Sequence, residues 1–140
     1  MSQSVGKVEA ASLQLDWAIR LLIDFDAPLP AITLAGAAEE ILGRALGDDS
    51  AHEDLIRAFS ESHGIDRKVL SQQHLNKARN WLKHWDPKTE PEFETFDLLQ
   101  EAIQGIARGL SNMAIHTRSI SAEGHRFHEW ASLLKQPAGP

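Results

Sequence analysis

Apolar residues recur every three or four positions along most of this chain, which is the spacing of one face of an α-helix. The first such stretch predicts a helix over residues 5–25, with apolar positions at Val8, Leu15, Ile19 and Leu22. No alternating apolar and polar run bounded by Asn-Gly or Asp-Gly is present, so we expect no hairpin. The sequence therefore predicts an all-α fold.

Glycine, proline and acidic residues divide this pattern into successive helices. Gly47 and Gly64 are placed to end helices, and Pro87 ends another because the residue before proline avoids helical geometry. Asp66 is placed as an N-cap, and the acids between Glu92 and Asp97 favour a helix start. The expected helices after the first cover residues 29–46, 51–60, 66 to 84 or 85, 92–110 and 122–134. The pattern leaves residues 111–121 unassigned.

Four long helices joined by short or moderate connections favour an up-and-down bundle of four to five helices. An irregular all-helical arrangement of the same elements is the alternative. At 140 residues the chain has the length of one domain, residues 1–140, with flexible ends expected at about 1–4 and 136–140. The second helix is rich in alanine and glycine, which let helix axes approach closely, so we expect it to be central.

Charge is distributed unevenly along the chain. The net charge is −6, but residues 67–88 contain six basic residues and one acid, a net charge of +5 that leaves −11 for the rest. A local basic patch attracts polyanions at short range, and a solvated helix face is the alternative explanation. The absence of cysteine excludes disulfides and thiolate metal sites. No secretory signal or membrane span is visible, so we expect a cytoplasmic protein.

The helix expected over residues 66–84 has two distinct faces when its residues are placed at about 100° intervals. The apolar face contains Leu75, Ala78, Leu82 and Trp85. The opposite face should form a continuous polar surface of Gln72, Asn76, Arg79, Asn80, Lys83 and His84. Trp81 lies between the two faces, so we expect it to contact a second chain.

Arg79 and His84 on one helix suggest phosphodiester chemistry. Arginine is a permanent cation that clamps phosphate, and histidine moves protons near neutral pH. Their spacing alone is a weak signal, because three other arginine–histidine pairs in the chain have a similar spacing. Asn80, directly after the arginine, makes the pattern much rarer, since the chain contains three asparagines.

The segment Arg79-Asn80-Trp81-Leu82-Lys83-His84 resembles the motif of the HEPN superfamily (higher eukaryotes and prokaryotes nucleotide-binding), and the small-residue segment Ala37–Leu42 adds to a likeness that covers about residues 29–110. The resemblance implies a metal-independent endoribonuclease, often a toxin or phage-defence component, or a non-catalytic relative that binds nucleic acid or protein. It also implies a homodimer with one composite cleft between two such helices, an RNA substrate and an antitoxin partner.

The resemblance implies a role for each polar residue of the motif. His84 would act as general base or acid at the ribose 2′-hydroxyl and the leaving oxygen. Arg79 would stabilise the charge that develops on the phosphorane. Asn80 would orient His84 or bind phosphate, and Lys83 would attract the substrate. No metal and no cofactor is expected.

The same residues also have purely structural interpretations. Arg79 would pair with an acid on a neighbouring helix, Asn80 would face solvent, and His84 would be a cation that complements the dipole at a helix C-terminus. Glu39 and Glu40 are expected as surface acids on the open face of the second helix. A contact between Glu40 and Arg79 that orients the guanidinium is the alternative.

His125 and His128 lie one helical turn apart on the last expected helix, with His116 upstream. Two imidazoles at this spacing can bind one metal ion. No third and fourth ligand is evident in the sequence, so we assign no metal site, and the role of these histidines stays open.

Overall fold

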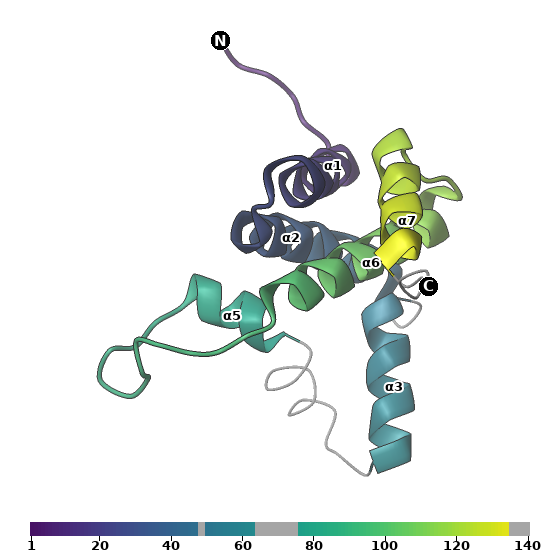
Figure 1. The fold of residues 1–140 in the computed structure, drawn as a ribbon. Helices are drawn as coiled ribbons and strands as arrows, with labels where there is room; N and C mark the ends of the chain where they lie inside the picture. The colour runs from purple at the N-terminus through teal and green to yellow at the C-terminus, as the bar shows by residue number, and fades with distance from the viewer. Residues whose placement is uncertain (48–49, 64–75, 135–140) are drawn as a thin grey trace, which may run out of the picture.

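The computed structural model describes residues 1–47, 50–63 and 76–134, and this part of the chain is helical without strands (Figure 1). Its helices are α1 (Lys7–Phe25), α2 (Pro28–Leu46), α3 (Ala51–His63), α5 (Lys77–Lys83), α6 (Leu98–Thr117) and α7 (Ala122–Leu134). The all-α prediction is confirmed, and the bounds of the first, second and last helices agree closely with the expected ones. None of the described helices is both long and apolar enough to cross a membrane.

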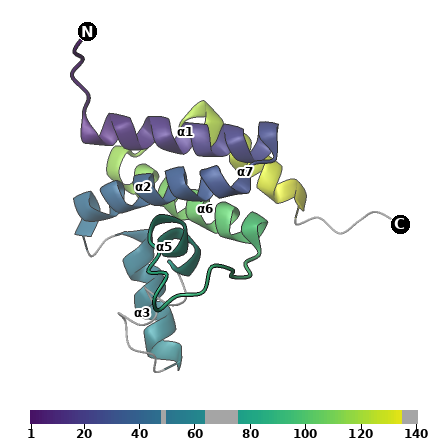
Figure 2. The same ribbon diagram turned by 90° about the vertical axis from the view of Figure 1, so that its left-hand side faces the viewer.

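Three helices, α1, α2 and α6, form the body of the fold, with α2 between the other two. Figures 1 and 2 show α1 and α2 side by side, α6 packed along α2, and α7 against α1, while α3 and α5 lie on the far side of the body from α1. The largest fully buried apolar side chains are Leu15, Ile19, Leu42, Ile106, Leu110 and Phe127. Burial of these side chains between the helices is the main favourable term in the stability of the fold.

Small residues let α2 pack closely against both neighbours. Ala31, Ala35 and Ala38 of α2 are fully buried. On the facing helix α6, a Cβ at Gly105 would lie 3.6 Å from the Cβ atom of Ala35, so the two helices meet there through small residues. The central position predicted for the second helix is confirmed.

The end of α2 follows its predicted signal, and a serine cap begins α3. Gly47 ends α2 with φ at 61°, in the left-handed region that glycine adopts without strain. Ser50 begins the next helix, because its Oγ accepts a 3.1 Å hydrogen bond from the Glu53 backbone N–H. The helix that was expected to end at Ser60 continues to His63.

The start of α6 differs from the prediction. A helix was expected from Glu92, but α6 begins at Leu98, and residues 91–97 form a non-helical segment. Asp97 is the N-cap, and its side chain accepts a 3.1 Å hydrogen bond from the Gln100 backbone N–H. The acids before it therefore lie outside the helix. Leu99, in the first turn of α6, is 41% exposed.

The end of α6 also lies beyond its predicted position. The helix passes Leu110 and continues to Thr117, through residues that the sequence pattern left unassigned. Asn112 and Met113 explain the extension, because both are buried against the body of the fold. A polar residue on the buried stripe had concealed the helical pattern.

The helix expected over residues 66–84 is described only at its C-terminal end, as α5. The predicted N-cap Asp66 and the face residues Gln72 and Leu75 lie outside the described residues, as does the expected flexible tail, 136–140. After Lys83 the chain leaves the helix, since His84 has extended backbone angles. Trp85 is consequently 57% exposed, so its predicted place on the core face is wrong.

Candidate functional site

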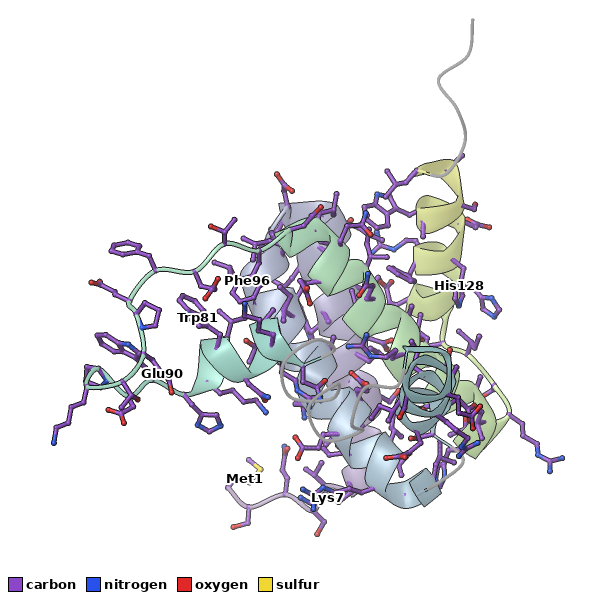
Figure 3. The ribbon with its side chains drawn as sticks, turned by 90° about the horizontal axis from the view of Figure 1, so that it is seen from below. Met1, Lys7, Trp81, Glu90, Phe96 and His128 are labelled. Atoms are coloured by element: carbon purple, nitrogen blue, oxygen red, sulfur yellow. The ribbon has the colours of Figure 1, made fainter. Side chains whose placement is uncertain are left out.

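Helix α5 packs against α2, and Ala78 is its buried residue, with 1% exposed. On its other side, the segment before α6 returns along it, and the rings of Trp81 and Phe96 meet edge to face with centroids 5.8 Å apart. Figure 3 shows these two rings next to each other. Trp81, which was expected to contact a second chain, is half-buried in this contact within its own chain.

Arg79 points toward α2 and away from solvent. Its side chain is 16% exposed, its Nη1 atom donates a 3.4 Å hydrogen bond to the Gly36 carbonyl oxygen, and the same atom lies 3.7 Å from Oε2 of Glu39. The arginine stem lies directly over Gly36, where a Cβ atom would overlap its Cδ atom. The predicted exposed position of Arg79 on a continuous polar face is therefore wrong, because a glycine on the neighbouring helix admits the side chain.

Glu39 is the buried acid that balances Arg79. It is 3% exposed, and Nε of Arg108 donates a 2.8 Å hydrogen bond to its Oε1 atom. The expectation that Glu39 is a surface acid is wrong, and the contact proposed for Glu40 with Arg79 is made by Glu39. Adjacent residues of a helix point about 100° apart. Glu39 therefore faces α6, while Glu40 faces the outside of α2.

Two residues of this cluster, Arg108 and Asn112, were missed by sequence reasoning. Asn112 is fully buried, and its Nδ2 donates a 3.4 Å hydrogen bond to the Glu39 carbonyl oxygen. Arg108 lies one turn earlier on α6, with 11% of its side chain exposed. The sequence signal that could have identified them is that two polar residues, four positions apart, interrupt an otherwise apolar stripe of the helix.

The space around the buried charges is small. It is lined by Gly36, Glu39, Arg79, Glu101, Gly105 and Arg108 among others, and its volume is about 10 Å³. That volume corresponds to about one water molecule, so a phosphate group does not fit beside Arg79 in this arrangement. Burial raises the pKa of the Glu101 carboxyl above its ordinary value, although the positive charge of Arg108 opposes the shift.

The other two basic residues of α5 are also close to acids. Nζ of Lys77 lies 3.6 Å from Oε1 of Glu94, and Nζ of Lys83 lies 3.7 Å from Oε2 of Glu40. Glu40 also accepts a 3.0 Å hydrogen bond from Arg44, which lowers the pKa of its carboxyl, and the charge of Lys83 acts in the same direction. Within α5, therefore, each positive charge of the predicted basic window faces a carboxylate.

His84 and Asn80 lie apart from the buried cluster. His84 is exposed, directly after the last residue of α5, and its backbone N–H donates to the Asn80 carbonyl oxygen at 3.1 Å. Because its backbone is extended, His84 does not continue the helix on which Asn80 lies. The structure thus places Arg79 inside the fold and His84 on the surface, while Asn80 is half-buried.

Two grooves lie beside α5. One, of about 350 Å³, has an apolar lining of Leu29, Ala78, Trp81, Leu82, Phe96 and Leu98 together with Glu94 and Thr95. The other, of about 510 Å³, lies between α1, α2 and α5 and is lined by Lys7, Val8, Ala37, Glu40, Ile41, Arg44, Ala45 and Lys83. The second groove contains three cations and one acid, so its side chains have a net positive charge.

The histidines of α6 and α7 lie on the surface. His116, His125 and His128 are all exposed, and Figure 3 shows His128 on the opposite side of the molecule from Trp81. Across residues 1–47, 50–63 and 76–134, no three histidine, aspartate or glutamate side chains group as a metal site would require.

Comparison of the chain with protein families, with curated proteins and with solved structures finds no match. The surroundings of α5 are therefore the basis for inferring a function.

Proposed function

We propose that this chain is a non-catalytic, HEPN-like module that binds a partner protein through the surface beside α5. The observation that carries the proposal is that Lys77, Arg79 and Lys83 each lie 3.6 to 3.7 Å from a carboxylate of the same chain. A ribonuclease needs a cation that is available for the charge developing on the phosphorane. In this arrangement Arg79 already faces the carboxylate of Glu39, whose single negative charge it shares with Arg108.

The buried position of Arg79 supports a structural role for this residue. A buried acid between two arginines is favourable only while its partners remain, because an uncompensated buried charge is costly. Through Glu39, Arg79 joins α5 to α2, and Arg108 joins α6 to the same acid. The arginine thereby holds α5, and the groove beside it, against the body of the fold.

A comparison of Arg79→Gln with His84→Gln tests this proposal. Both purified variants and the parent chain are incubated with single-stranded RNA in EDTA, and their thermal unfolding is followed by circular dichroism. We expect intact RNA in every sample, a lower Tm for Arg79→Gln and an unchanged Tm for His84→Gln. RNA cleavage that either substitution abolishes, with Tm preserved, would overturn the proposal.

A metal-independent endoribonuclease is the second candidate, and the cationic groove favours it. Lys7, Arg44 and Lys83 line that groove, and the exposed His84 directly follows the last of them. In this candidate a homodimer forms the composite cleft, His84 transfers protons, and the cations of the groove attract RNA. Arg79 would have to turn away from Glu39 to stabilise the phosphorane, and Asn80 would bind phosphate.

This second candidate places the protein in the cytoplasm as a toxin or phage-defence component with an antitoxin partner. Its test is the same cleavage assay with Lys7→Gln and Lys83→Gln, for which Lys88→Gln on the following loop is the control. Loss of cleavage in the first two variants alone would support the candidate. Equal cleavage in all three would remove the groove from the mechanism.

A further inference from the structure

The apolar groove beside α5 adjoins an acidic segment of the chain. Leu29, Trp81, Leu82, Phe96 and Leu98 supply most of its wall, and Leu29 remains 44% exposed. Glu94 and Thr95 also line it, and with Phe96 they belong to a segment, residues 85–97, that contains five acids and one lysine, a net charge of −4. An apolar groove in contact with water is unfavourable unless another surface covers it.

We propose that this groove binds a basic amphipathic peptide segment of a partner protein, whose large apolar side chains fill the groove while its lysines or arginines face residues 85–97. The inference rests on the proposed function and names the chemistry of the partner. Charge complementarity selects this occupant, because opposite charges across an interface favour association and like charges oppose it.

The same charges disfavour two other occupants. A second copy of this chain, docked by the same surface, would bring two segments of net charge −4 together, and RNA would bring a polyanion to them. Four of the five acids are exposed and outside the cation pairs of α5, namely Asp86, Glu90, Glu92 and the N-cap Asp97. Figure 3 shows Glu90 on the loop that extends past Trp81 and Phe96. These acids are available to a basic partner.

The apolar part of the surface extends beyond the groove itself. On the same loop, Trp85 and Phe93 are 57% and 83% exposed. Trp85 is nevertheless oriented, since its Nε1 atom donates a 3.3 Å hydrogen bond to the Glu90 carbonyl oxygen. Exposed aromatic side chains next to acidic residues suit a partner that is both apolar and basic.

The probe for this proposal is a synthetic amphipathic helix of leucine and lysine, labelled for fluorescence anisotropy. Its control is the same peptide with glutamate in place of lysine. We expect the lysine peptide to bind the full chain and the glutamate peptide not to bind. Equal binding of both peptides would overturn the charge argument, and binding of neither would overturn the proposal itself.

Matched variants place the binding on the groove. The double variant Glu90→Lys, Glu92→Lys should weaken binding of the lysine peptide by about tenfold. The control is the double variant Glu9→Lys, Glu129→Lys, which makes the same charge change at exposed acids of α1 and α7 and should have a much smaller effect on binding. Circular dichroism melts confirm that each variant is folded. An equal effect of the two pairs would mean that net charge alone, and not this segment, attracts the peptide.

The apolar contact has its own matched pair. Leu29→Ser changes a residue of the groove and should weaken binding of the lysine peptide by about fivefold. Leu133→Ser changes a 65% exposed leucine of α7 and should leave binding unchanged. Unchanged binding in both variants would exclude the groove as the site. If light scattering shows a dimer that Leu29→Ser converts to a monomer, the occupant of the groove is a second copy of the chain. If oligo-uridine displaces the lysine peptide, the occupant is RNA.

These outcomes separate the two proposals. RNA cleavage lost in Arg79→Gln or His84→Gln overturns the non-catalytic function whether or not the peptide binds. If the RNA stays intact and the peptide does not bind, the non-catalytic function is still supported and only the proposal of a basic partner is overturned.

Discussion

Nε of Arg108 donates a 2.8 Å hydrogen bond to Oε1 of Glu39, and this buried contact joins α6 to α2. Arg79 reaches the other carboxylate oxygen from α5, at 3.7 Å. One acid on the central helix thus has a cation on each of two neighbouring elements. The arrangement makes Glu39 a structural centre of the region around α5.

Replacing Glu39 with glutamine should destabilise the fold, because it leaves two largely buried arginines without their counter-charge. We expect the free energy of unfolding to fall by about 3 kcal/mol, measured by urea denaturation. The control is the adjacent Glu40→Gln, since Glu40 forms exposed pairs of the kind that contribute only about 0–1 kcal/mol. Equal losses in the two variants would contradict a special role for the buried acid.

Gly36→Ala should displace Arg79, because a Cβ at this position would overlap the arginine Cδ atom. Arg79 would then lose its contacts with α2, and we expect a destabilisation of about 1–2 kcal/mol with faster hydrogen exchange in α5. Gly43→Ala on the same helix is the control, since its Cβ would have neighbours no closer than 3.8 Å. That variant should be neutral or stabilised by up to about 1 kcal/mol.

Asp97→Ala should weaken the start of α6, because the side chain accepts the hydrogen bond from the Gln100 backbone N–H. Loss of such a cap costs about 1 kcal/mol, which a thermal melt resolves as a lower Tm. Asp97→Ser keeps an oxygen that can accept the same hydrogen bond, so it should retain most of the stability. If Asp97→Ser lowers the Tm as much as Asp97→Ala does, loss of the capping hydrogen bond is not the cause of the destabilisation.

The pair formed by Asp24 and Arg126 should make stability depend on pH. Arg126 donates hydrogen bonds of 2.7 and 2.9 Å to the two carboxylate oxygens, and these bonds hold the pKa of Asp24 below its ordinary value of 3.8. The stabilisation is therefore present above about pH 4 and is lost as the pH falls through the lowered pKa in the folded state.

Melts of the parent chain and Asp24→Asn across pH 2 to 7 measure this contribution. The variant should have the lower Tm at pH 7, and the two curves should converge in strong acid. Asp54→Asn is the comparison, since Asp54 lies 3.5 Å from Arg57 in an exposed pair within one helical turn. A Tm difference that persists unchanged at pH 2 would show that the carboxylate charge of Asp24 is not responsible.

The helices that the sequence predicted most closely are those determined by short-range information. The apolar spacing of α1 and α2 and the position of Gly47 depend on neighbours within a few residues, so their bounds agreed with the structure. Asp97 was named among several acids as a start signal, and the structure shows that it is the cap. Where several residues can begin a helix, local signals do not select among them.

The candidate site was less predictable, because its geometry depends on contacts distant in sequence. The helical wheel placed Arg79 at the edge of the polar face, about 60° from Leu82, and nothing within α5 selects burial over exposure for the arginine. The decisive residue is Gly36, 43 positions earlier in the chain. The wheel also assumed that the helix continues to His84, whereas α5 ends at Lys83.

The amino-acid sequence by itself determined that this chain is helical and that its second helix is rich in small residues, because periodicity and side-chain size are properties of neighbouring positions. It also placed arginine, asparagine and histidine together in one short segment. Only the tertiary structure decided that Arg79 lies against Glu39 while His84 stays in solvent. The physical reason is that burial and charge pairing depend on which helices pack together, and a glycine on α2 allows an arginine on α5 to enter.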